Sequence, residues 1–309
     1  MNTGLGIVAG ARADPERVLR SLELAVNRKL DGLLQGDHQG FLPGAGTETG
    51  DARLYEWGDE IRHIDWPLTA RSGAVHVRDT VADRELETWV LVDGSASMEF
   101  GTATCRKRDL ALAAVAAVGF LTARTGNRTG VILLDGPRPR TIPARSGRPA
   151  LFALLHAVAR RPSAPDGRRV DLAAGVGALL RPPRRRGLAV VVSDFLCTSP
   201  WPRALRYVAA RHQVLAVEII DPRELELPSV GYLTLVDPET GRQRDVQTSS
   251  PALRARYAAA AAAQRAANAT AIRRAGAAHL VLRTDRDWLL DTIAFVAAAR
   301  RTRGQKSRT

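Results

Sequence analysis

From residue 86 onward, short apolar runs alternate with longer helical stretches, and this pattern restricts the fold more than any other feature of the chain. The runs are continuous in Val, Leu and Ile, which is typical of strands buried on both faces of a parallel sheet. They occupy residues 86–92, 129–134, 188–192, 214–220 and 279–282. We therefore predict an α/β fold with a mostly parallel sheet and helices on both faces.

The segments between these runs repeat their apolar residues at helical spacing. The predicted helices lie near residues 105–124, 148–160, 171–181, 201–211, 251–276 and 286–301. One interruption follows the 214–220 strand, where two strand-like segments, 231–236 and 242–247, flank Asp237-Pro238-Glu239-Thr240-Gly241. Proline and glycine at these turn positions predict an inserted β-hairpin.

The first 85 residues lack this alternation. A helix is predicted to begin at Asp14-Pro15-Glu16, because an aspartate acceptor before a proline is a common helix start. A glycine-rich loop and two short strands, near 54–56 and 74–81, follow. We expect three parts: an N-terminal segment (1–85), an α/β domain (86–300) and a basic tail (301–309).

The chain is strongly basic, with a net charge of +13 over 309 residues. Only Lys29, Lys107 and Lys306 are lysines, and the other basic residues are arginines, a bias that a GC-rich genome produces by itself. The alternative is selection for an acidic partner, either nucleic acid or an acidic protein surface. A basic nucleic-acid-associated protein is therefore kept as an alternative function, although no recognition helix or base-stacking motif is evident.

The sequence predicts a cytoplasmic protein without a transmembrane segment. Its two cysteines show no zinc-ligand spacing and fit a reducing compartment. The longest strongly apolar uncharged stretch, Leu110–Ala123, is shorter than the roughly 18–20 residues that a membrane span needs. The N-terminus lacks the pattern of a signal peptide.

Polar side chains follow two of the predicted strands at the point where each strand ends. The 86–92 strand runs into Asp93-Gly94-Ser95-Ala96-Ser97, and the 188–192 strand runs into Ser193-Asp194. Ligands of open α/β sheets bind beyond the carboxyl ends of the strands. A carboxylate with hydroxyls is a hard oxygen set that suits Mg²⁺ or Mn²⁺. The alternative is that Asp93 and Ser95 only turn the chain and cap the next helix.

These residues carry a family resemblance. Asp93-Gly94-Ser95-Ala96-Ser97 resembles the metal-ion-dependent adhesion site of von Willebrand factor A domains. Residues 53–66 read R-x-Y-x-x-G-D-x-x-R-x-I-D-W and precede Ala70-Arg71. With Asp221-Pro222-Arg223-Glu224 and the 237–241 turn, this pattern resembles the bacterial "domain of unknown function fifty-eight" family, over residues 36 to 300. The resemblance implies a Rossmann-like von Willebrand A domain that acts as a non-enzymatic adaptor or co-chaperone of MoxR-type AAA+ ATPases.

The resemblance also implies a ligand set for the cation. Asp93, Ser95 and Ser97 match the D-x-S-x-S ligands, and Asp194 matches the second aspartate, which often acts through water. Val170 stands where a threonine ligand is expected, and an isopropyl group cannot coordinate a metal. Asp171 beside it is a candidate replacement. We expect weak binding of Mg²⁺ or Mn²⁺, with the side chains of Asp93, Ser95 and Ser97 facing solvent.

The upstream box has two interpretations. Asp59, Arg62, Asp65 and Arg71 alternate in charge beside Trp66 and other aromatic residues. They can form a salt-bridged clasp that fixes the N-terminal segment onto the sheet. Alternatively, they form a partner-binding surface, since Trp and Arg are favoured at interface hot spots.

The function predicted from the sequence is metal-assisted binding of a partner carboxylate. The expected partner is a MoxR-type AAA+ ATPase or its client protein. A metal-dependent hydrolase that uses the same site is a further alternative, although no general base is evident in the sequence.

Overall fold

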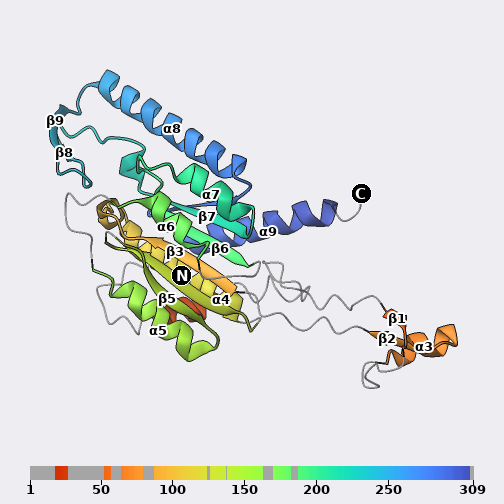
Figure 1. Ribbon diagram of the computed structural model, residues 1–309. Helices are drawn as coiled ribbons and strands as arrows, with labels where there is room; N and C mark the ends of the chain where they lie inside the picture. Colours follow the sequence, from red (N-terminus) through yellow and green to blue (C-terminus); the bar gives the residue numbers. More distant parts are fainter. Residues whose placement is uncertain are drawn as a thin grey trace.

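The computed structural model describes residues 18–26, 52–56, 64–78, 87–123, 126–136, 138–162, 170–181 and 187–306, with side chains up to residue 299 (Figure 1). Its centre is a six-stranded sheet in the order β10-β7-β6-β3-β4-β5. The strands are β3 (Glu87–Asp93), β4 (Arg128–Leu134), β5 (Arg140–Arg145), β6 (Leu188–Ser193), β7 (Gln213–Ile220) and β10 (Ala278–Arg283).

The sheet confirms the predicted fold class. All neighbouring strands are parallel except β5, which pairs antiparallel with β4 at the edge. Counted from β3 along the chain, the strands lie in the order 3-2-1-4-5-6, which is that of a Rossmann-like doubly wound sheet. The order reverses between β3 and β6, so a crevice for ligands is expected where these two strands end.

Strand β5 was not predicted from the sequence. Its residues, Arg-Thr-Ile-Pro-Ala-Arg, are mostly exposed and lack a continuous apolar run. Proline is tolerated at a sheet edge because an edge strand does not need every backbone N–H for pairing. The antiparallel edge is therefore a feature that an apolar-run pattern cannot reveal.

Helices cover both faces of the sheet (Figure 1). On one face, α4 (Lys107–Ala123), α5 (Arg148–Ala159), the start of α9 (Trp288–Lys306) and residues 18–26 share one apolar core. On the other, α6 (Leu172–Ala178), α7 (Trp201–Ala209) and the end of α8 (Pro251–Arg274) share a second. Val90 and Leu91 are both fully buried, one in each core, which explains the continuous apolar runs in the sequence.

The long apolar stretch beginning at Leu110 forms α4, which is buried along most of its length. Among the helices described, none has the length and apolarity needed to cross a membrane. Helix α8 is instead largely exposed, with Asn268 and Ile272 as its buried residues, as expected for a surface helix.

Two small antiparallel pairs accompany the main sheet. The predicted hairpin is confirmed as β8 (Tyr232–Val236) and β9 (Gln243–Gln247). Strands β1 (Ala52–Leu54) and β2 (His76–Arg78) pair around α3 (Trp66–Ser72), and this unit lies away from the six-stranded sheet in Figure 1. The division at residue 85 stays a prediction, but residues 18–26 pack into the core of the main sheet.

A close cross-strand fit at Gly130 gives a test of this packing. Gly130 lies opposite Trp89, and a Cβ atom at Gly130 would come within 2.7 Å of the indole ring. Gly130→Ala should lower the free energy of unfolding by about 1–3 kcal/mol, because the buried ring must shift. Gly136→Ala is the control, since nothing lies within 4 Å of its added Cβ. Equal urea midpoints for the two variants would contradict the described register.

Candidate functional site

The site is built where the reversal of strand order places two strand ends side by side. Val92 of β3 pairs with Val192 of β6, so Asp93 and Ser193 end adjacent strands. The Ser193 hydroxyl donates to Asp93 Oδ2 at 2.6 Å, and the Ser95 backbone N–H donates to Asp93 Oδ1 at 2.9 Å. The second bond is the local turn contact that the alternative interpretation expects. It does not conflict with a further role for the carboxylate.

The serine hydroxyls of the loop lie next to this carboxylate. Ser95 Oγ and Ser97 Oγ are 3.0 Å apart, and Ser97 lies in the 3-10 helix η3 (Ala96–Glu99). The expectation that Asp93, Ser95 and Ser97 face solvent is wrong, since their exposed fractions are 4%, 7% and 9%. A strand end need not be a surface, and here the turn of the inserted hairpin contacts the loop through Glu239 and the Ser97 N–H.

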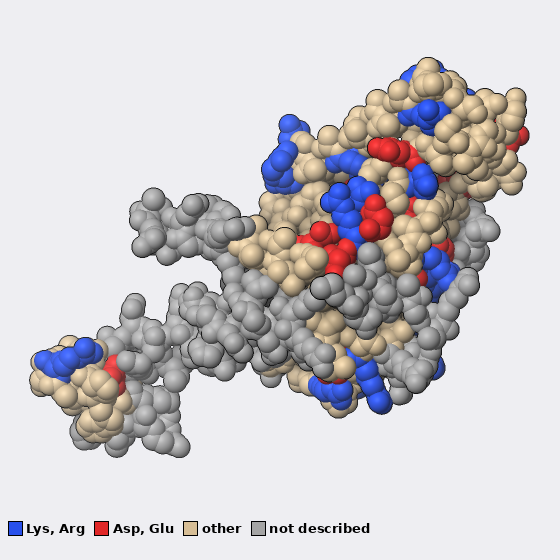
Figure 2. Space-filling model, turned by 180° about the vertical axis from the view of Figure 1, so that it is seen from behind, with Lys and Arg blue, Asp and Glu red and all other residues tan. Residues whose placement is uncertain are grey.

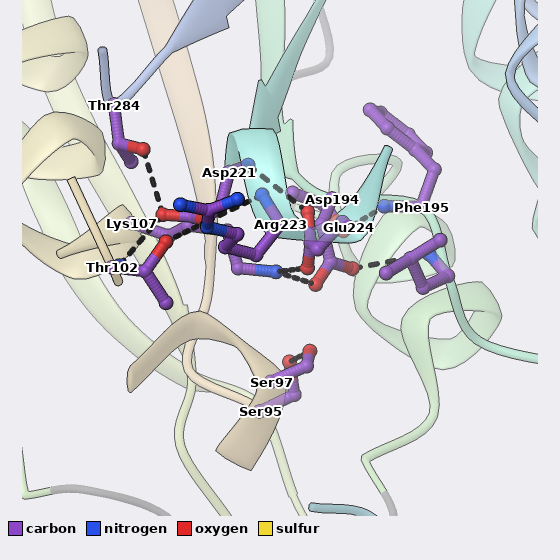
Figure 3. A network of polar contacts seen from close by, with 12 residues as sticks. Ser95, Ser97, Thr102, Lys107, Asp194, Phe195, Asp221, Arg223, Glu224 and Thr284 are labelled. Atoms are coloured by element: carbon purple, nitrogen blue, oxygen red, sulfur yellow. Dashed lines mark hydrogen bonds and ion pairs between the residues drawn. The ribbon is translucent and has the colours of Figure 1, made fainter. Parts of the chain in front are cut away.

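Asp194 contacts a buried cation of the chain itself. The Lys107 ammonium, at the start of α4, is fully buried and donates to Asp194 Oδ2 at 2.7 Å. It also pairs with Glu224 Oε1, so one ammonium bridges two carboxylates (Figure 3). The bridge thereby joins three segments that are distant in the sequence: the start of α4, the residue after β6 and the turn after β7.

The Asp221-Pro222-Arg223-Glu224 motif supports this bridge. Asp221 and Glu224 form a reciprocal capping box around the short helix η4 (Pro222–Glu224). Asp221 also accepts hydrogen bonds from the hydroxyls of Thr102 and Thr284, at 2.6 and 2.8 Å (Figure 3). The motif therefore fixes the carboxylate of Glu224 at Lys107.

Helix α8 is tied to the same network through Arg265. Its Nη1 donates to the Asp194 carbonyl at 3.0 Å and to Glu218 at 2.8 Å, and its Nη2 donates to Glu224 at 3.2 Å. Phe195, which follows Asp194, has a φ of 55°, an uncommon backbone conformation for a bulky residue. Its ring packs against Trp201 with centroids 4.8 Å apart, which holds this strained position in place.

The two aspartates differ in their electrostatics. Burial acts to raise the pKa of Asp194, but the charge and hydrogen bond of Lys107 outweigh it, and the pKa lies below its usual value. For Asp93, burial and the negative charge of Asp194 raise the pKa. Asp93 has no ion pair with any cation among the described residues. It is therefore the carboxylate at this edge that a cation would stabilise.

The hairpin supplies a site residue that the sequence argument did not identify. Glu239, in the turn between β8 and β9, accepts a hydrogen bond from the Ser97 backbone N–H at 3.3 Å. The turn is stabilised by Asp237, whose Oδ1 accepts from the Glu239 N–H at 2.9 Å. A carboxylate from 142 residues away thus lies on the Ser95–Ser97 loop.

The remaining predicted ligands lie differently. Val170 is half-buried and packs against the second apolar core. Asp171 is exposed and caps α6, accepting from the N–H groups of Ala173 and Ala174 at 2.9 and 3.2 Å. Its side chain is therefore engaged at the helix start rather than turned to the predicted ligands.

A Mg²⁺ or Mn²⁺ ion fits this donor set in part. Asp93, Ser95 and Ser97 bring hard oxygen donors together, and the buried carboxylate of Asp93 forms no ion pair with the described residues. Within the described ranges, no three Asp, Glu, His or Cys side chains group so that they could hold a metal. A cation would therefore depend on the two hydroxyls, since Asp194 already pairs with Lys107.

The upstream box is only partly described. Asp59 and Arg62 lie outside the described residues. Asp65 is buried and caps α3 through a bond from the Leu68 N–H at 3.2 Å. Trp66 is 65% exposed and Arg71 is exposed, so neither anchors the segment onto the main sheet. The clasp interpretation is wrong for these two residues.

Basic residues do not form a continuous patch on the face shown in Figure 2, where acidic side chains lie among them. Several arginines are paired, as in Arg283 with Asp285 and Arg148 with Glu23. This intermixing does not favour a phosphate-binding stripe of the kind that nucleic-acid binding requires.

A family model described as "Protein of unknown function DUF58" matches residues 51–267. The chain belongs to this family. An uncharacterized protein of Mycobacterium tuberculosis is 54% identical over 283 residues, covering 92% of this chain and 89% of the relative. An uncharacterized protein of Mycobacterium avium is 52% identical over 160 residues, covering 52% of this chain and 94% of the relative.

Two solved structures resemble this chain at much lower sequence identity. The conserved hypothetical protein BatB from Bacteroides thetaiotaomicron has a TM-score of 0.42 and 12% identity, covering 70% of this chain and 99% of that chain. The SpRpn10 VWA domain has a TM-score of 0.32 and 12% identity, covering 43% and 75%. The strand order and the D-x-S-x-S strand end described above are those of a von Willebrand A-like domain in this DUF58 protein.

The Lys107 bridge gives a stability test. Lys107→Met should lower the free energy of unfolding by about 3–5 kcal/mol at neutral pH, because buried Asp194 loses its paired cation and Glu224 keeps only Arg265 among the described residues. The lowered pKa of Asp194 stabilises the fold above the unfolded value of about 3.9, and this stabilisation is lost as the pH falls through the folded pKa. The defect in Lys107→Met should therefore shrink in acid.

The matched control is an exposed ion pair. Arg140 pairs with Asp135 at 2.9 Å with half of its side chain exposed, so Arg140→Gln should cost less than about 1 kcal/mol. Denaturant unfolding of both variants between neutral and acid pH measures the difference. A Lys107→Met protein as stable as the Arg140→Gln protein would show that the bridge does not hold the site together.

Proposed function

We propose that this DUF58 protein is a non-enzymatic binding adaptor whose von Willebrand A-like domain captures an acidic side chain of a partner protein. The observation that carries the proposal is the contact of Glu239 with the Ser97 N–H beside Asp93 and Asp194. The Ser97 N–H of the loop already donates a hydrogen bond to a carboxylate there, so the same edge suits a carboxylate from a partner.

A divalent cation would complete this chemistry. Asp93, Ser95 and Ser97 are the residues that would hold Mg²⁺ or Mn²⁺, and the cation would supply the positive charge that attracts a partner's carboxylate. Lys107 keeps Asp194 ionised and oriented beside them. The proposed site therefore consists of Asp93, Ser95 and Ser97, with the buried ammonium of Lys107 paired to the neighbouring Asp194.

The proposed partner is a MoxR-type AAA+ ATPase or its client, in the cytoplasm. This assignment rests on the family resemblance together with the absence of a recognised ATP-binding motif in this chain. Exposed Trp66 and Arg71 on α3 offer a second contact surface, because Trp and Arg are favoured at binding hot spots.

The metal proposal is tested by restoring the missing hydroxyl. Wild-type protein should bind Mn²⁺ weakly in calorimetry, and Val170→Thr should bind it more tightly, because a threonine adds the oxygen ligand that the valine lacks. Val170→Ala is the control, since it changes the volume at this position without adding an oxygen. If the wild type and Val170→Thr both fail to bind Mn²⁺ and Mg²⁺, the metal-assisted form of the proposal is wrong.

A second test separates binding from folding. Asp93→Asn keeps an acceptor for Ser193 but removes the charge, so Mg²⁺-dependent capture of the AAA+ partner should be lost. The raised pKa of Asp93 means that its ionisation destabilises the fold as the pH rises from about 3.9 through the folded pKa. Without metal, the melting temperature of Asp93→Asn at neutral pH should therefore equal or exceed that of the wild type.

Asp135→Asn is the matched control for Asp93→Asn. Asp135 directly follows β4 at the same edge of the sheet, but its carboxylate pairs with Arg140 rather than with the serine loop. Asp135→Asn should leave Mg²⁺-dependent capture of the AAA+ partner unchanged. A destabilised Asp93→Asn protein that still captures the partner would show that Asp93 only shapes the turn.

A further inference from the structure

A cavity of about 130 Å³ lies at the start of α4, outside the Asp93 site. Three arginines line it: Arg106 directly before α4, Arg108 in the first turn of α4, and Arg161 just after α5. Asp109 is the one carboxylate among the lining residues that the structure describes, and its Oδ2 accepts from the Arg106 N–H at 3.2 Å. The cavity therefore has an excess of guanidinium groups.

Arg161 is the unusual member of this group. Its exposed fraction is 3%, and its Nη1 donates to the Val158 carbonyl at 3.3 Å. Its Nε and Nη2 atoms are buried and have no hydrogen-bond partner among the residues that the structure describes. A buried donor without a partner is costly, and such groups are rare in native proteins. The side chain is thus held by one nitrogen, while one edge of the guanidinium is left for a ligand.

Elsewhere in the same chain, the Nε–Nη2 edge of an arginine binds a carboxylate. Arg148 binds Glu23 through Nε and Nη2 at 2.7 and 2.8 Å, and Arg283 binds Asp285 through the same two atoms at 2.8 and 2.7 Å. The Nε–Nη2 edge matches two oxygens of one anion. Arg161 lines the cavity and has the same pair of donors without a partner among the described residues.

The electrostatics agree with this geometry. Burial and the positive charge of Arg108 lower the pKa of Arg161 to about 10, although Glu99, Asp93 and Asp109 act in the opposite direction. Arg108 itself is occupied, since its Nη1 donates to both oxygens of Glu99 at 2.8 and 3.0 Å. The nearby carboxylates therefore leave the charge of Arg161 incompletely compensated.

We propose that this cavity is a binding site for a phosphate group, held by the Nε–Nη2 edge of Arg161 with Arg106 at its rim. The volume is well below the roughly 300–1,000 Å³ of sites for drug-sized ligands, so it suits a single small oxyanion. A tetrahedral anion can use both guanidinium groups at once, which a planar carboxylate does less well. The group is free phosphate or the terminal phosphate of a monoester.

Calorimetry with inorganic phosphate tests the site on the full chain, in a buffer without other oxyanions and at constant ionic strength. Wild type should bind phosphate, and phosphate should raise its melting temperature where chloride does not. Arg161→Lys keeps the charge but loses the paired donors, so affinity should fall by about tenfold or more. Arg160→Lys is the control, because Arg160 is exposed and adjacent in the chain.

Arg106→Gln provides a second variant at the rim, where 42% of the side chain is exposed and its ion pair with Glu99 is long, at 3.6 Å. It should also weaken phosphate binding. Titration with glucose 6-phosphate in place of phosphate shows whether the cavity binds a phosphate monoester. Titration with acetate shows whether a carboxylate binds there as well. The proposal is overturned if wild type does not bind phosphate, if acetate binds equally well, or if Arg161→Lys and Arg106→Gln both bind like Arg160→Lys.

Discussion

The buried ammonium of Lys107 is the interaction on which the architecture of the site depends. It joins the start of α4, the residue after β6 and the turn after β7 through Asp194 and Glu224. Buried charges lose hydration, so such a bridge persists only when further hydrogen bonds satisfy its members. Arg265 and the capping box of Asp221 and Glu224 provide these bonds, which explains why a sequence motif far from Asp93 lies beside it.

Because of the bridge, the two aspartates have different electrostatic environments. Asp194 pairs with a cation that belongs to the chain, whereas Asp93 is buried among hydroxyl and amide donors and forms no ion pair with the described residues. In a site with two free aspartates, both would depend on a bound metal for stability. Here Lys107 lowers the pKa of Asp194 and so favours its ionised form, which leaves Asp93 as the aspartate that an added cation would stabilise.

The sheet was predictable because both of its faces are covered, so each central strand is a continuous apolar run such as Val90–Val92. The position of Asp93 and Asp194 followed from the rule that ligands bind at the carboxyl ends of strands. Their burial did not follow, since the groups around them come from distant segments that no periodicity brings together, such as Lys107 at Asp194 and Glu239 at the Ser97 N–H. Lys107 is recognisable in the sequence in one way: it is one of three lysines in a chain that otherwise uses arginine, at the start of a helix that is buried along most of its length.

The hairpin brings a third carboxylate to an edge that already carries two. Burial raises the pKa of Glu239, the Ser97 N–H opposes that rise, and the charges of Asp93 and Asp194 add to it. The contact of Glu239 with Ser97 is therefore weakened by repulsion from the same residues that would attract a cation. Positive charge near Asp93 would remove this repulsion and hold the hairpin more firmly. A partner carboxylate that bound the Ser97 N–H would then have to displace Glu239. The hairpin would therefore compete with an acidic partner for this hydrogen-bond donor.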